Sequence, residues 1–465
     1  MTERPRLAVV GAGPAGLAAA LAAAARGVRV TLVDAADQAG GQFYRQPAAA
    51  LGARRPQALH HQWRTWVRLR EGLDRHREAG RITHLSDHHV WCAARDSDSG
   101  ALAVHALLGP AQEDGVTVHA DAVLLATGGY ERVLPFPGWT LPGVVTAGGA
   151  QAMLKGGLVL PGRTVVVAGT GPLLLPVAAG LAAAGARVAA LVESAGPGPL
   201  LHRAPALAAQ PGKLAEGAGY AARLLRHGVR ALTRHTVVTA HGTDRLEAVT
   251  VAALGRDGHP RPGRTRRIAC DTLAVGHGML PHTDLAETLG CTLSGTAVRV
   301  DAEQRTDVPG VWAAGEATGV GGAALALAEG HIAGCSAAAR LRGTTPDPHG
   351  WAAAARARGR LRAFATALDE VYAPPAGWAD RIPDATVVCR CEEVTAGEVR
   401  GAVESLGAGD LRTVKLLTRA GMGWCQGRMC APAVAGLTGC PLTAGRRPFA
   451  RPVPLGVLAA LPEPE

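Results

Sequence analysis

One pattern occurs twice in this chain and limits its fold more than any other feature. It consists of an apolar strand, a glycine-rich turn, an Ala-rich helix, a second strand and an acidic residue. The first copy has its turn at residues 11–16 and ends at Asp34, and the second places Gly169 158 residues after Gly11 and ends at Glu193. Because this order is that of a βαβ unit that binds a dinucleotide, the sequence predicts an α/β protein with two such layers.

The first turn predicts a nucleotide site in detail. It reads Gly11, Ala12, Gly13, Pro14, Ala15 and Gly16. Its glycines allow a tight turn, close approach of the backbone to a pyrophosphate, and close packing of helix on strand. The helix N-terminus offers free N–H groups to the phosphates. Asp34 follows the second strand, where a carboxylate accepts hydrogen bonds from the ribose hydroxyls.

Three later stretches indicate which dinucleotide binds there. An apolar strand at 121–126 ends in Thr127-Gly128, the stretch 308–316 ends in Gly315-Glu316, and Gly41-Gln42 follows the second strand. These resemble the accessory motifs of flavoproteins with two dinucleotide-binding domains, in which the ATG turn contacts FAD and an AxGD carboxylate holds the ribityl chain. Glu316 replaces the usual Asp, and a Glu still accepts the hydroxyl. We therefore expect FAD.

The second copy departs from the pattern at one position. Gly169, Gly171 and Glu193 match the first copy, but Leu174 stands where the third glycine would be. Glu193 favours an unphosphorylated ribose, so NAD or another adenine nucleotide is one expectation. The alternative is a Rossmann layer that binds nothing of catalytic use. Because no Cys-x-x-Cys lies near either turn, a dithiol mechanism is not expected.

Composition excludes several other classes of protein. The chain has 465 residues, enough for about three domains, and a net charge of +10. Only three of its 48 basic residues are lysines, so the charge reflects a bias towards arginine, and aromatic residues make up 3%. We expect no nucleic-acid partner, because such a partner requires a basic stripe with stacking aromatics.

The N-terminus and the apolar segments predict neither export nor membrane insertion. Residues 1–5 lead directly into the first strand without a basic segment and an apolar core, so no signal peptide is expected. The uncharged stretch 164–186 is long enough to span a bilayer, but its Gly-Thr-Gly-Pro turn divides it into a strand and a helix. The expected location is the cytoplasm, with no transmembrane segment.

Four of the nine cysteines form a distinct group near the C-terminus. Cys389 and Cys391 are separated by one residue, and Cys425 and Cys430 by four. Between the pairs we expect two short helices, the first opened by a capping box at Thr395 and the second capped by Asp410. Glycines at 421, 423 and 427 allow the backbone to wrap closely around a bound group. The other five cysteines are isolated and are expected to be small buried residues.

Three interpretations of this group compete. A Cys₄ zinc site usually has two Cys-x₂₋₄-Cys pairs, whereas one pair here has a single intervening residue. Disulfides are rare in a reducing cytosol. A [2Fe–2S] cluster held by the four thiolates of Cys389, Cys391, Cys425 and Cys430 is the interpretation we favour, and zinc is the main alternative.

The cysteine segment resembles the [2Fe–2S] domain of bacterioferritin-associated ferredoxin, in the form fused to flavoprotein subunits. Together with the rest of the chain it resembles the FAD-containing alpha subunits of heteromeric amino-acid and opine dehydrogenases. These include the Rossmann subunit of hydrogen cyanide synthase, the A subunits of octopine and nopaline oxidases, and the alpha subunit of D-hydroxyproline dehydrogenase. The nucleotide-binding part also resembles sarcosine oxidase alpha. The stretches that carry this resemblance are 130–132, 138–143, 275–281, 421–430 and 451–456.

The resemblance implies a division of labour between subunits. A partner flavoprotein subunit of the amino-acid oxidase type oxidises the C–N bond, and this chain relays the electrons. It also implies FMN at a subunit interface in some members and a small ferredoxin-like subunit in others. We assign no catalytic acid or base, because no loop offers a general base, a nucleophile or an Arg clamp for an amino acid. The competing hypotheses are a stand-alone NADH-dependent reductase and a zinc-stabilised interaction module.

The expected domain organisation has the FAD-binding part interrupted by the second layer. After it, the helix expected at 351–372 carries Arg356, Arg358, Arg360 and Arg362, either as a docking face for an acidic partner or as a solvated face. The expected segments are residues 1–150, FAD-binding, first part; 151–275, second Rossmann-like, NAD-type domain; 276–345, FAD-binding, closing part; 346–380, linker and basic helix; 381–440, [2Fe–2S] domain; and 441–465, tail.

Overall fold

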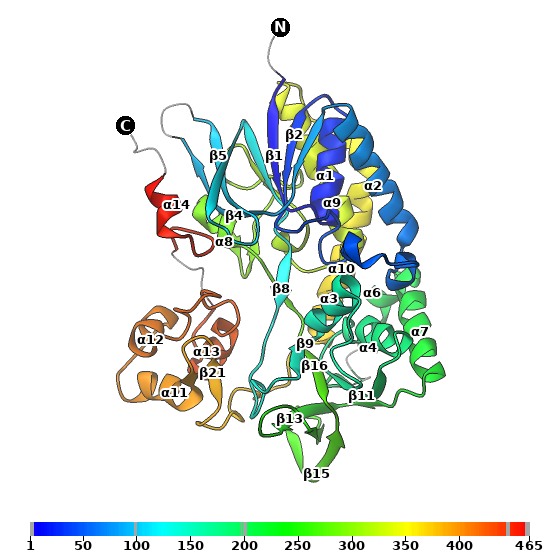
Figure 1. The fold of residues 1–465 in the computed structure, drawn as a ribbon, viewed down its shortest axis with the longest axis vertical. Helices are drawn as coiled ribbons and strands as arrows, with labels where there is room; N and C mark the ends of the chain where they lie inside the picture. Colours follow the sequence, from blue (N-terminus) through cyan, green and yellow to red (C-terminus); the bar gives the residue numbers. More distant parts are fainter. Residues whose placement is uncertain (1–3, 97–99, 197, 199–201, 443–446, 461–465) are drawn as a thin grey trace.

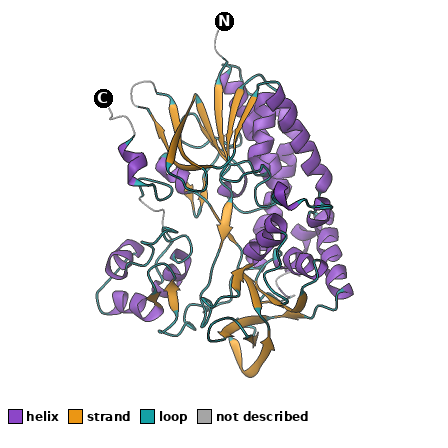
Figure 2. Ribbon diagram, in the orientation of Figure 1, coloured by secondary structure: helices purple, strands orange, loops and turns teal. Residues whose placement is uncertain are grey.

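In the computed structural model the described chain comprises residues 4–96, 100–196, 198, 202–442 and 447–460. It forms two α/β units joined by thin connections, with a small helical body beside them (Figure 1). Parts of the expected tail, at 443–446 and 461–465, lie outside the described residues. Helices and strands are distinguished in Figure 2.

The first unit is a five-stranded parallel sheet whose strands come from distant parts of the chain. In sheet order these are β20 (Val311–Ala313), β7 (Ala122–Leu125), β1 (Arg6–Val10), β2 (Arg29–Val33) and β3 (Ile82–Leu85). Their Val, Leu and Ala side chains are buried on both faces, as parallel sheets require. In sequence, β20 is the last of these strands, and it follows all the strands of the second unit.

Helices cover one face of this sheet and a second, small sheet covers the other. The helices are α1 (Pro14–Ala24), α2 (Trp63–Glu78) and α9 (Ala323–Leu341). The small sheet is antiparallel and contains β4 (His88–Arg95), β5 (Leu102–Leu108) and β6 (Asp114–Ala120). Gly330 and Gly334 let α9 lie directly on α1, since a Cβ at either would overlap a backbone oxygen of that helix.

The second unit repeats this plan. Its parallel sheet has the order β12 (Ala231–Thr233), β11 (Arg187–Glu193), β10 (Thr164–Gly169), β16 (Thr272–Gly276) and β9 (Val144–Thr146). One face packs on α3 (Ala147–Gly157), α4 (Leu174–Ala183) and α7 (Pro211–Arg226). The other packs on an antiparallel sheet of β13 (His235–His241), β14 (Ala248–Leu254) and β15 (Pro260–Ala269). Because β9 pairs with β16, this unit begins ahead of the expected limit at residue 150.

Two antiparallel strands connect the units. These are β8 (Gly129–Glu131), which leaves the first sheet, and β17 (Met279–Pro281), which returns to it. The shorter elements of the two units are η1 (Ala49–Leu51), η2 (Pro56–Leu59), α6 (Ala204–Ala208), α8 (Asp284–Thr288), β18 (Leu293–Ser294), β19 (Ala297–Val298) and η3 (Gly315–Thr318).

The C-terminal part begins with the basic helix and ends on the first unit. Its elements are η4 (Pro348–Trp351), α10 (Ala352–Val371), β21 (Val387–Cys389), β22 (Val394–Thr395), α11 (Ala396–Glu404), α12 (Leu411–Thr418), α13 (Ala431–Thr438) and α14 (Leu455–Ala459). The predicted capping box of Thr395 with Glu398 and the predicted cap at Asp410 are confirmed. Val457 of α14 packs on Trp91 and Leu107. In the described part of the chain no helix is long and apolar enough to cross a membrane.

Candidate functional site

The first glycine turn leaves no room for side chains at two of its positions. Gly11 has φ +101°, and a Cβ there would overlap the carbonyl oxygen of Ala126. A Cβ at Gly16 would overlap the carbonyl oxygen of Gly11. The turn therefore lies directly against β7, and α1 begins at Pro14 with its N-terminus directed at the ends of the strands. This is the geometry that a pyrophosphate requires.

Asp34 follows the end of β2 and lies beside the same turn. Its carboxylate accepts hydrogen bonds from the backbone N–H groups of Ala12 and of Ala36, the latter at 2.7 Å. Burial raises the pKa of Asp34, and these two N–H groups oppose that shift. The carboxylate thus lies beside the turn, where a ribose would hydrogen-bond to it.

The accessory stretches converge on this turn. Gly41 has φ +59°, and a Cβ there would lie 2.8 Å from the Cα of Gly13. The hydroxyl of Thr127 donates to the carbonyl of His282 at 2.6 Å, and Gly128 has open space above it. Gln42, the residue after Gly41, accepts two hydrogen bonds from Arg45, at 2.8 and 3.2 Å.

Gly315 and Glu316 follow the end of β20, and Gly315 lies against the first glycine turn. Gly315 has φ +76°, and a Cβ there would lie 2.8 Å from the Cβ of Ala15. Burial raises the pKa of Glu316, against a hydrogen bond from the N–H of Gly322. A half-buried carboxyl group at this place is suited to hydrogen-bond a hydroxyl of a bound flavin chain.

Sequence reasoning missed a second acid beneath this turn. Glu329, only 1% exposed, accepts hydrogen bonds from the N–H of Gly315 and from the Thr318 hydroxyl, each at 3.0 Å. Arg362 of the basic helix pairs with the same carboxylate and donates to the carbonyl of Gly319 at 2.8 Å. No local motif marks this pairing, because Arg362 lies 33 residues from Glu329 in the sequence.

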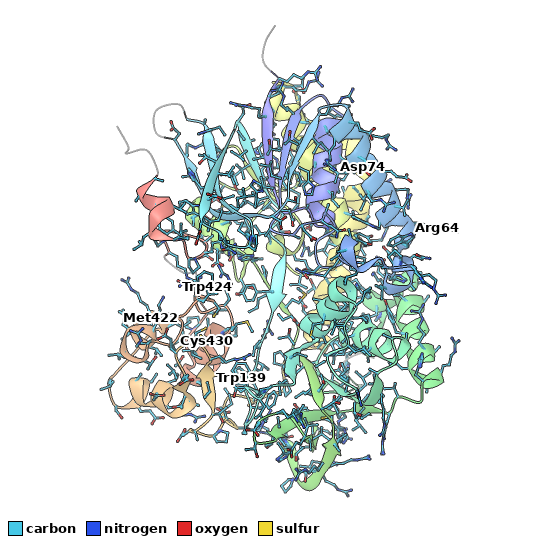
Figure 3. All side chains as sticks on the ribbon, in the orientation of Figure 1. Arg64, Asp74, Trp139, Met422, Trp424 and Cys430 are labelled. Atoms are coloured by element: carbon cyan, nitrogen blue, oxygen red, sulfur yellow. The ribbon has the colours of Figure 1, made fainter. Side chains whose placement is uncertain are left out.

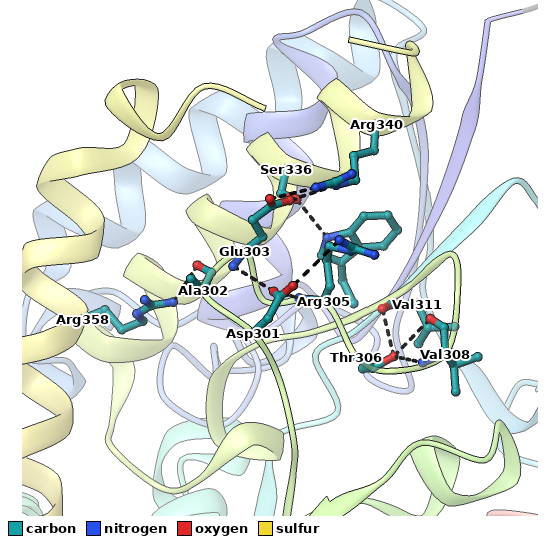
Figure 4. Close-up of polar contacts among 11 residues, drawn as sticks. Asp301, Ala302, Glu303, Arg305, Thr306, Val308, Val311, Ser336, Arg340 and Arg358 are labelled. Atoms are coloured by element: carbon teal, nitrogen blue, oxygen red, sulfur yellow. Dashed lines mark hydrogen bonds and ion pairs between the residues drawn. The ribbon is translucent and has the colours of Figure 1, made fainter. Parts of the chain in front are cut away.

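Two of the four arginines of the basic helix, Arg358 and Arg362, therefore bind other parts of the chain. Arg358 donates to the carbonyl of Ala302 at 3.0 Å (Figure 4). It also donates to the side chain of Gln304 at 3.2 Å. Nearby, Glu303 binds both Ser336 and Arg340 of α9. Neither a docking face nor a solvated face describes Arg358 and Arg362, whose partners lie within the chain.

The second glycine turn copies the first in part. A Cβ at Gly169, φ +134°, would overlap the carbonyl oxygen of Gly276, whereas Gly171 has open space around it. Glu193 accepts from the N–H of Gly171 at 3.1 Å and of Ala195 at 2.8 Å, as Asp34 does in the first unit. Leu174 is buried, and α4 begins at this residue.

The buried position of Glu193 should make the free energy of unfolding depend on pH. Burial raises its pKa to about 7, against backbone hydrogen bonds from Ala195 and Gly171. Its proton is held in the folded chain but released on unfolding between its ordinary pKa of 4.5 and about 7, so stability is lost as pH rises through that range. Glu193→Gln should remove up to about 3 kcal/mol of this loss. Thermal unfolding at pH 5, 6, 7 and 8 measures it. The exposed Glu113→Gln should leave the wild-type slope unchanged, and an equal slope in Glu193→Gln would contradict the assignment.

The four grouped thiols come together as two hydrogen-bonded pairs, Cys389 with Cys430 and Cys391 with Cys425. Cys389 and Cys430 are buried, Cys391 is exposed and Cys425 is half-buried. All nine cysteines lie in the described part of the chain as free thiols. Within the described ranges no three His, Cys, Asp or Glu side chains form a site for a single metal ion.

The surroundings of Cys389 suit a thiolate, whereas pairing with Cys389 and burial raise the pKa of Cys430. A hydrogen bond from Cys430, with backbone N–H groups of Gly421, Glu392 and Cys391, lowers the pKa of Cys389 to about 5 despite burial. A Cβ at Gly423 would lie 3.0 Å from the sulfur of Cys391. N–H groups directed at sulfur and glycine backbone against it are what an iron–sulfur cluster requires.

These features together define a class of protein. Two βαβ units with an FAD-type turn and its accessory motifs, followed by a four-cysteine body, are the parts of a flavin-dependent oxidoreductase that also carries an iron–sulfur domain. Comparison with known families agrees. Residues 5–340 match the pyridine nucleotide-disulphide oxidoreductase family, and residues 387–437 match the BFD-like [2Fe–2S] binding domain.

The chain belongs to the pyridine nucleotide-disulphide oxidoreductase family, in the group of FAD-dependent subunits that the sequence resembled. It is 36% identical to the HcnB subunit of hydrogen cyanide synthase from Pseudomonas protegens, over 91% of this chain and 89% of the relative. It is 34% identical to the A subunit of opine oxidase from Rhizobium meliloti, over 98% of each chain. The crystal structure of L-proline dehydrogenase from P. horikoshii has the same fold, with a TM-score of 0.67 and 20% identity over 98% of this chain and 81% of that one.

Proposed function

We propose that this chain is the electron-transfer subunit of a multi-subunit dehydrogenase that oxidises the C–N bond of an amino acid or an opine. The observation that carries the proposal is the presence of an FAD-type glycine turn and a four-cysteine body in a chain similar over nearly its whole length to HcnB and to the A subunit of opine oxidase. Both relatives are named as subunits, which supports a partner that provides the substrate site.

The proposed FAD site is built from the first glycine turn and the accessory stretches that lie against it. When bound, FAD would supply two-electron redox chemistry and a [2Fe–2S] cluster would carry single electrons. The turn glycines would hold the pyrophosphate, Asp34 the ribose, and Glu316 the ribityl chain. The proposed FAD-binding residues are Gly11, Gly13, Pro14, Ala15, Gly16, Asp34, Gly41, Gln42, Thr127, Gly128, Gly315 and Glu316, and the proposed cluster ligands are Cys389, Cys391, Cys425 and Cys430.

The partners follow from the same proposal. The substrate would bind to a flavoprotein subunit of the amino-acid oxidase type. FMN at the subunit interface and a small ferredoxin-like subunit would be further components. The first unit, with residues 276–345, would bind FAD; the second would bind NAD or another adenine nucleotide through Gly169, Gly171 and Glu193.

The test is purification of the chain alone and with its native partners. Alone, it should carry flavin, iron and acid-labile sulfide yet oxidise no amino acid or opine; with its partner, it should accept electrons from such a substrate. Turnover of an amino acid by the isolated chain would overturn the division of labour. Zinc in place of iron and sulfide would favour a structural C-terminal module.

A second candidate is a stand-alone NADH-dependent reductase. It is favoured by one observation, the repetition at Glu193 of the carboxylate geometry at Asp34. Stopped-flow mixing of the flavin-loaded chain with NADH tests it. Rapid bleaching of the flavin without any partner would support this candidate, and an unchanged flavin spectrum would remove it.

A further inference from the structure

One carboxylate connects the four-cysteine body to the flavin-type unit. The carboxylate of Asp284, the first residue of α8, accepts a hydrogen bond from Nε of Arg428 at 2.6 Å and another from Nη1 of Arg447 at 3.0 Å. Nε2 of His282 lies 3.2 Å from the same carboxylate. Arg428 lies between Cys425 and Cys430, so the loop that carries two of the thiols is fastened directly to the first unit.

This set of charges is largely withdrawn from water. The side chains of Asp284, Arg428 and Arg447 are 14%, 19% and 24% exposed. Burial acts to raise the pKa of Asp284, but His282 and the two guanidinium groups outweigh it and lower the pKa to about 2. Asp284 is therefore ionised at neutral pH. A buried carboxylate between two arginines is costly to remove, because its loss leaves their charges uncompensated.

Two residues before Asp284, the backbone of His282 is hydrogen-bonded to the accessory turn Thr127-Gly128. The N–H of His282 donates to the carbonyl of Gly128 at 3.0 Å, and the carbonyl of His282 accepts from the Thr127 hydroxyl at 2.6 Å. On the other side, Nη1 of Arg428 donates weakly to the carbonyl of Cys425 at 3.4 Å. A short series of hydrogen bonds thus runs from the proposed flavin site to the proposed cluster site.

A second contact, made by Trp139, also holds the cysteine body. Nε1 of Trp139, on the connection that follows β8, donates to the carbonyl of Val387 at 2.6 Å, and Arg390 lies over the Trp139 ring at 5.6 Å. Met429 packs against the apolar cluster that contains Trp139. Trp139 and Cys430 lie on neighbouring parts of the molecule (Figure 3). Two separate contacts therefore fix both the position and the orientation of the body.

We infer that Asp284 is a positioning residue: it holds the loop of Cys425 and Cys430 at a fixed place relative to the FAD-type turn, so that electrons pass between the two centres. The redox part of this inference rests on the proposed function; the docking part does not. Asp284 contacts no thiol and lies outside the proposed FAD-binding residues, so its substitution should leave both cofactors bound.

Hydrogen exchange of the full chain tests the docking. In Asp284→Asn, backbone amides of residues 421–430 and 387–389 should lose at least about 30-fold of their protection, because one partner of a buried charge pair has been removed. Amides of β1 and β10 should keep theirs. Asp307→Asn is the matched control, since Asp307 also pairs with an arginine, Arg299 at 3.5 Å, on the surface of the same unit. Unchanged protection of 421–430 in Asp284→Asn would overturn the inference.

A double-mutant cycle separates docking from general loss of structure. Arg428→Gln alone should give the same local loss, and the double variant Asp284→Asn with Arg428→Gln should lose less than the sum of the two. If Asp284→Asn does not fold, Arg428→Gln and Arg447→Gln replace it. Loss of protection spread evenly over the chain in those variants would overturn the positioning role.

The redox readout is the transfer of one electron from photoreduced flavin to the oxidised cluster. It is followed by the electron paramagnetic resonance signal of the reduced cluster. In Asp284→Asn this transfer should slow by at least tenfold, with iron, sulfide and flavin contents and the shape of the cluster signal unchanged. A wild-type rate with weakened docking would overturn the electron-transfer role. Absence of a cluster in the wild-type chain would instead overturn the proposed function and leave the exchange result standing.

Discussion

Gly16→Ala should yield a chain that is largely free of FAD and less stable by about 3 kcal/mol. The added Cβ overlaps the carbonyl oxygen of Gly11, and because this atom belongs to the backbone, the main chain itself must shift. Gly11 in turn lies against Ala126, the residue after β7, so the turn is held from both sides. Either α1 moves away from the sheet or the turn opens, and both remove N–H groups from the proposed pyrophosphate site. Flavin absorbance of the purified chain and its thermal unfolding measure the two effects.

Gly219→Ala is the matched control for this prediction. Gly219 lies within α7, with no atom within 4 Å of the position that a Cβ would take. Because alanine favours helix more than glycine, this variant should be as stable as the wild type or more so, by up to about 1 kcal/mol. It should also keep its flavin. A Gly16→Ala chain with wild-type flavin content would show that the close approach at this turn has no role in binding.

The turns and their acids were predictable because their geometry is local. A strand, three spaced glycines and an acid after the next strand determine where Gly11, Gly16 and Asp34 lie, whatever the rest of the chain does. The helix caps at Thr395 and Asp410 are local in the same sense, and both are confirmed. The replacement of the third glycine by Leu174 also coincides with a different start of the helix. Helix α4 begins at Leu174 itself, whereas α1 begins at Pro14, two positions ahead of Gly16.

The contacts that join distant segments were not predictable. Arg362 stood out in the sequence only as one of four arginines on a helix, and its pairing with the buried Glu329 depends on how α10 packs against α9. Likewise, nothing in the sequence indicates that Arg428, which lies between Cys425 and Cys430, binds Asp284 of the first unit. Pairings of this kind depend on the tertiary fold, and a single sequence carries no periodic signal for them.

Asp284 and Trp139 illustrate the same limit at the level of domains. Trp139 follows β8 and Asp284 begins α8 shortly after β17, in a region where sequence indicated only a family resemblance at 138–143 and 275–281. Neither residue is near the two dinucleotide-type turns or the four grouped cysteines in the chain. Their importance arises because the C-terminal segment returns to the first unit, where the N–H of Ala450 binds the carbonyl of Trp91 at 2.8 Å.

Cys391→Ala should abolish the iron–sulfur cluster without lowering the stability of the metal-free chain. Cys391 is exposed, so its thiol makes no contribution to the apolar core, and replacing it costs little packing energy. As one of four proposed ligands, however, it is required to hold the second iron. Iron and acid-labile sulfide should fall below about a tenth of the wild-type content. Chemical analysis of both elements and the visible spectrum measure this result.

Two further variants separate a ligand from a structural thiol. Cys389→Ala removes a buried thiol and should lose both the cluster and some stability, since a cavity adds to the loss of a ligand. Cys440→Ala, at the edge of the same body, should keep the cluster, because Cys440 is outside the proposed ligand set and its thiol donates only weakly to the carbonyl of Gly409, at 3.6 Å. If the exposed Cys391 can be replaced with full retention of iron and sulfide, the four-thiolate assignment fails, because no packing effect at an exposed position can offset the loss of a ligand.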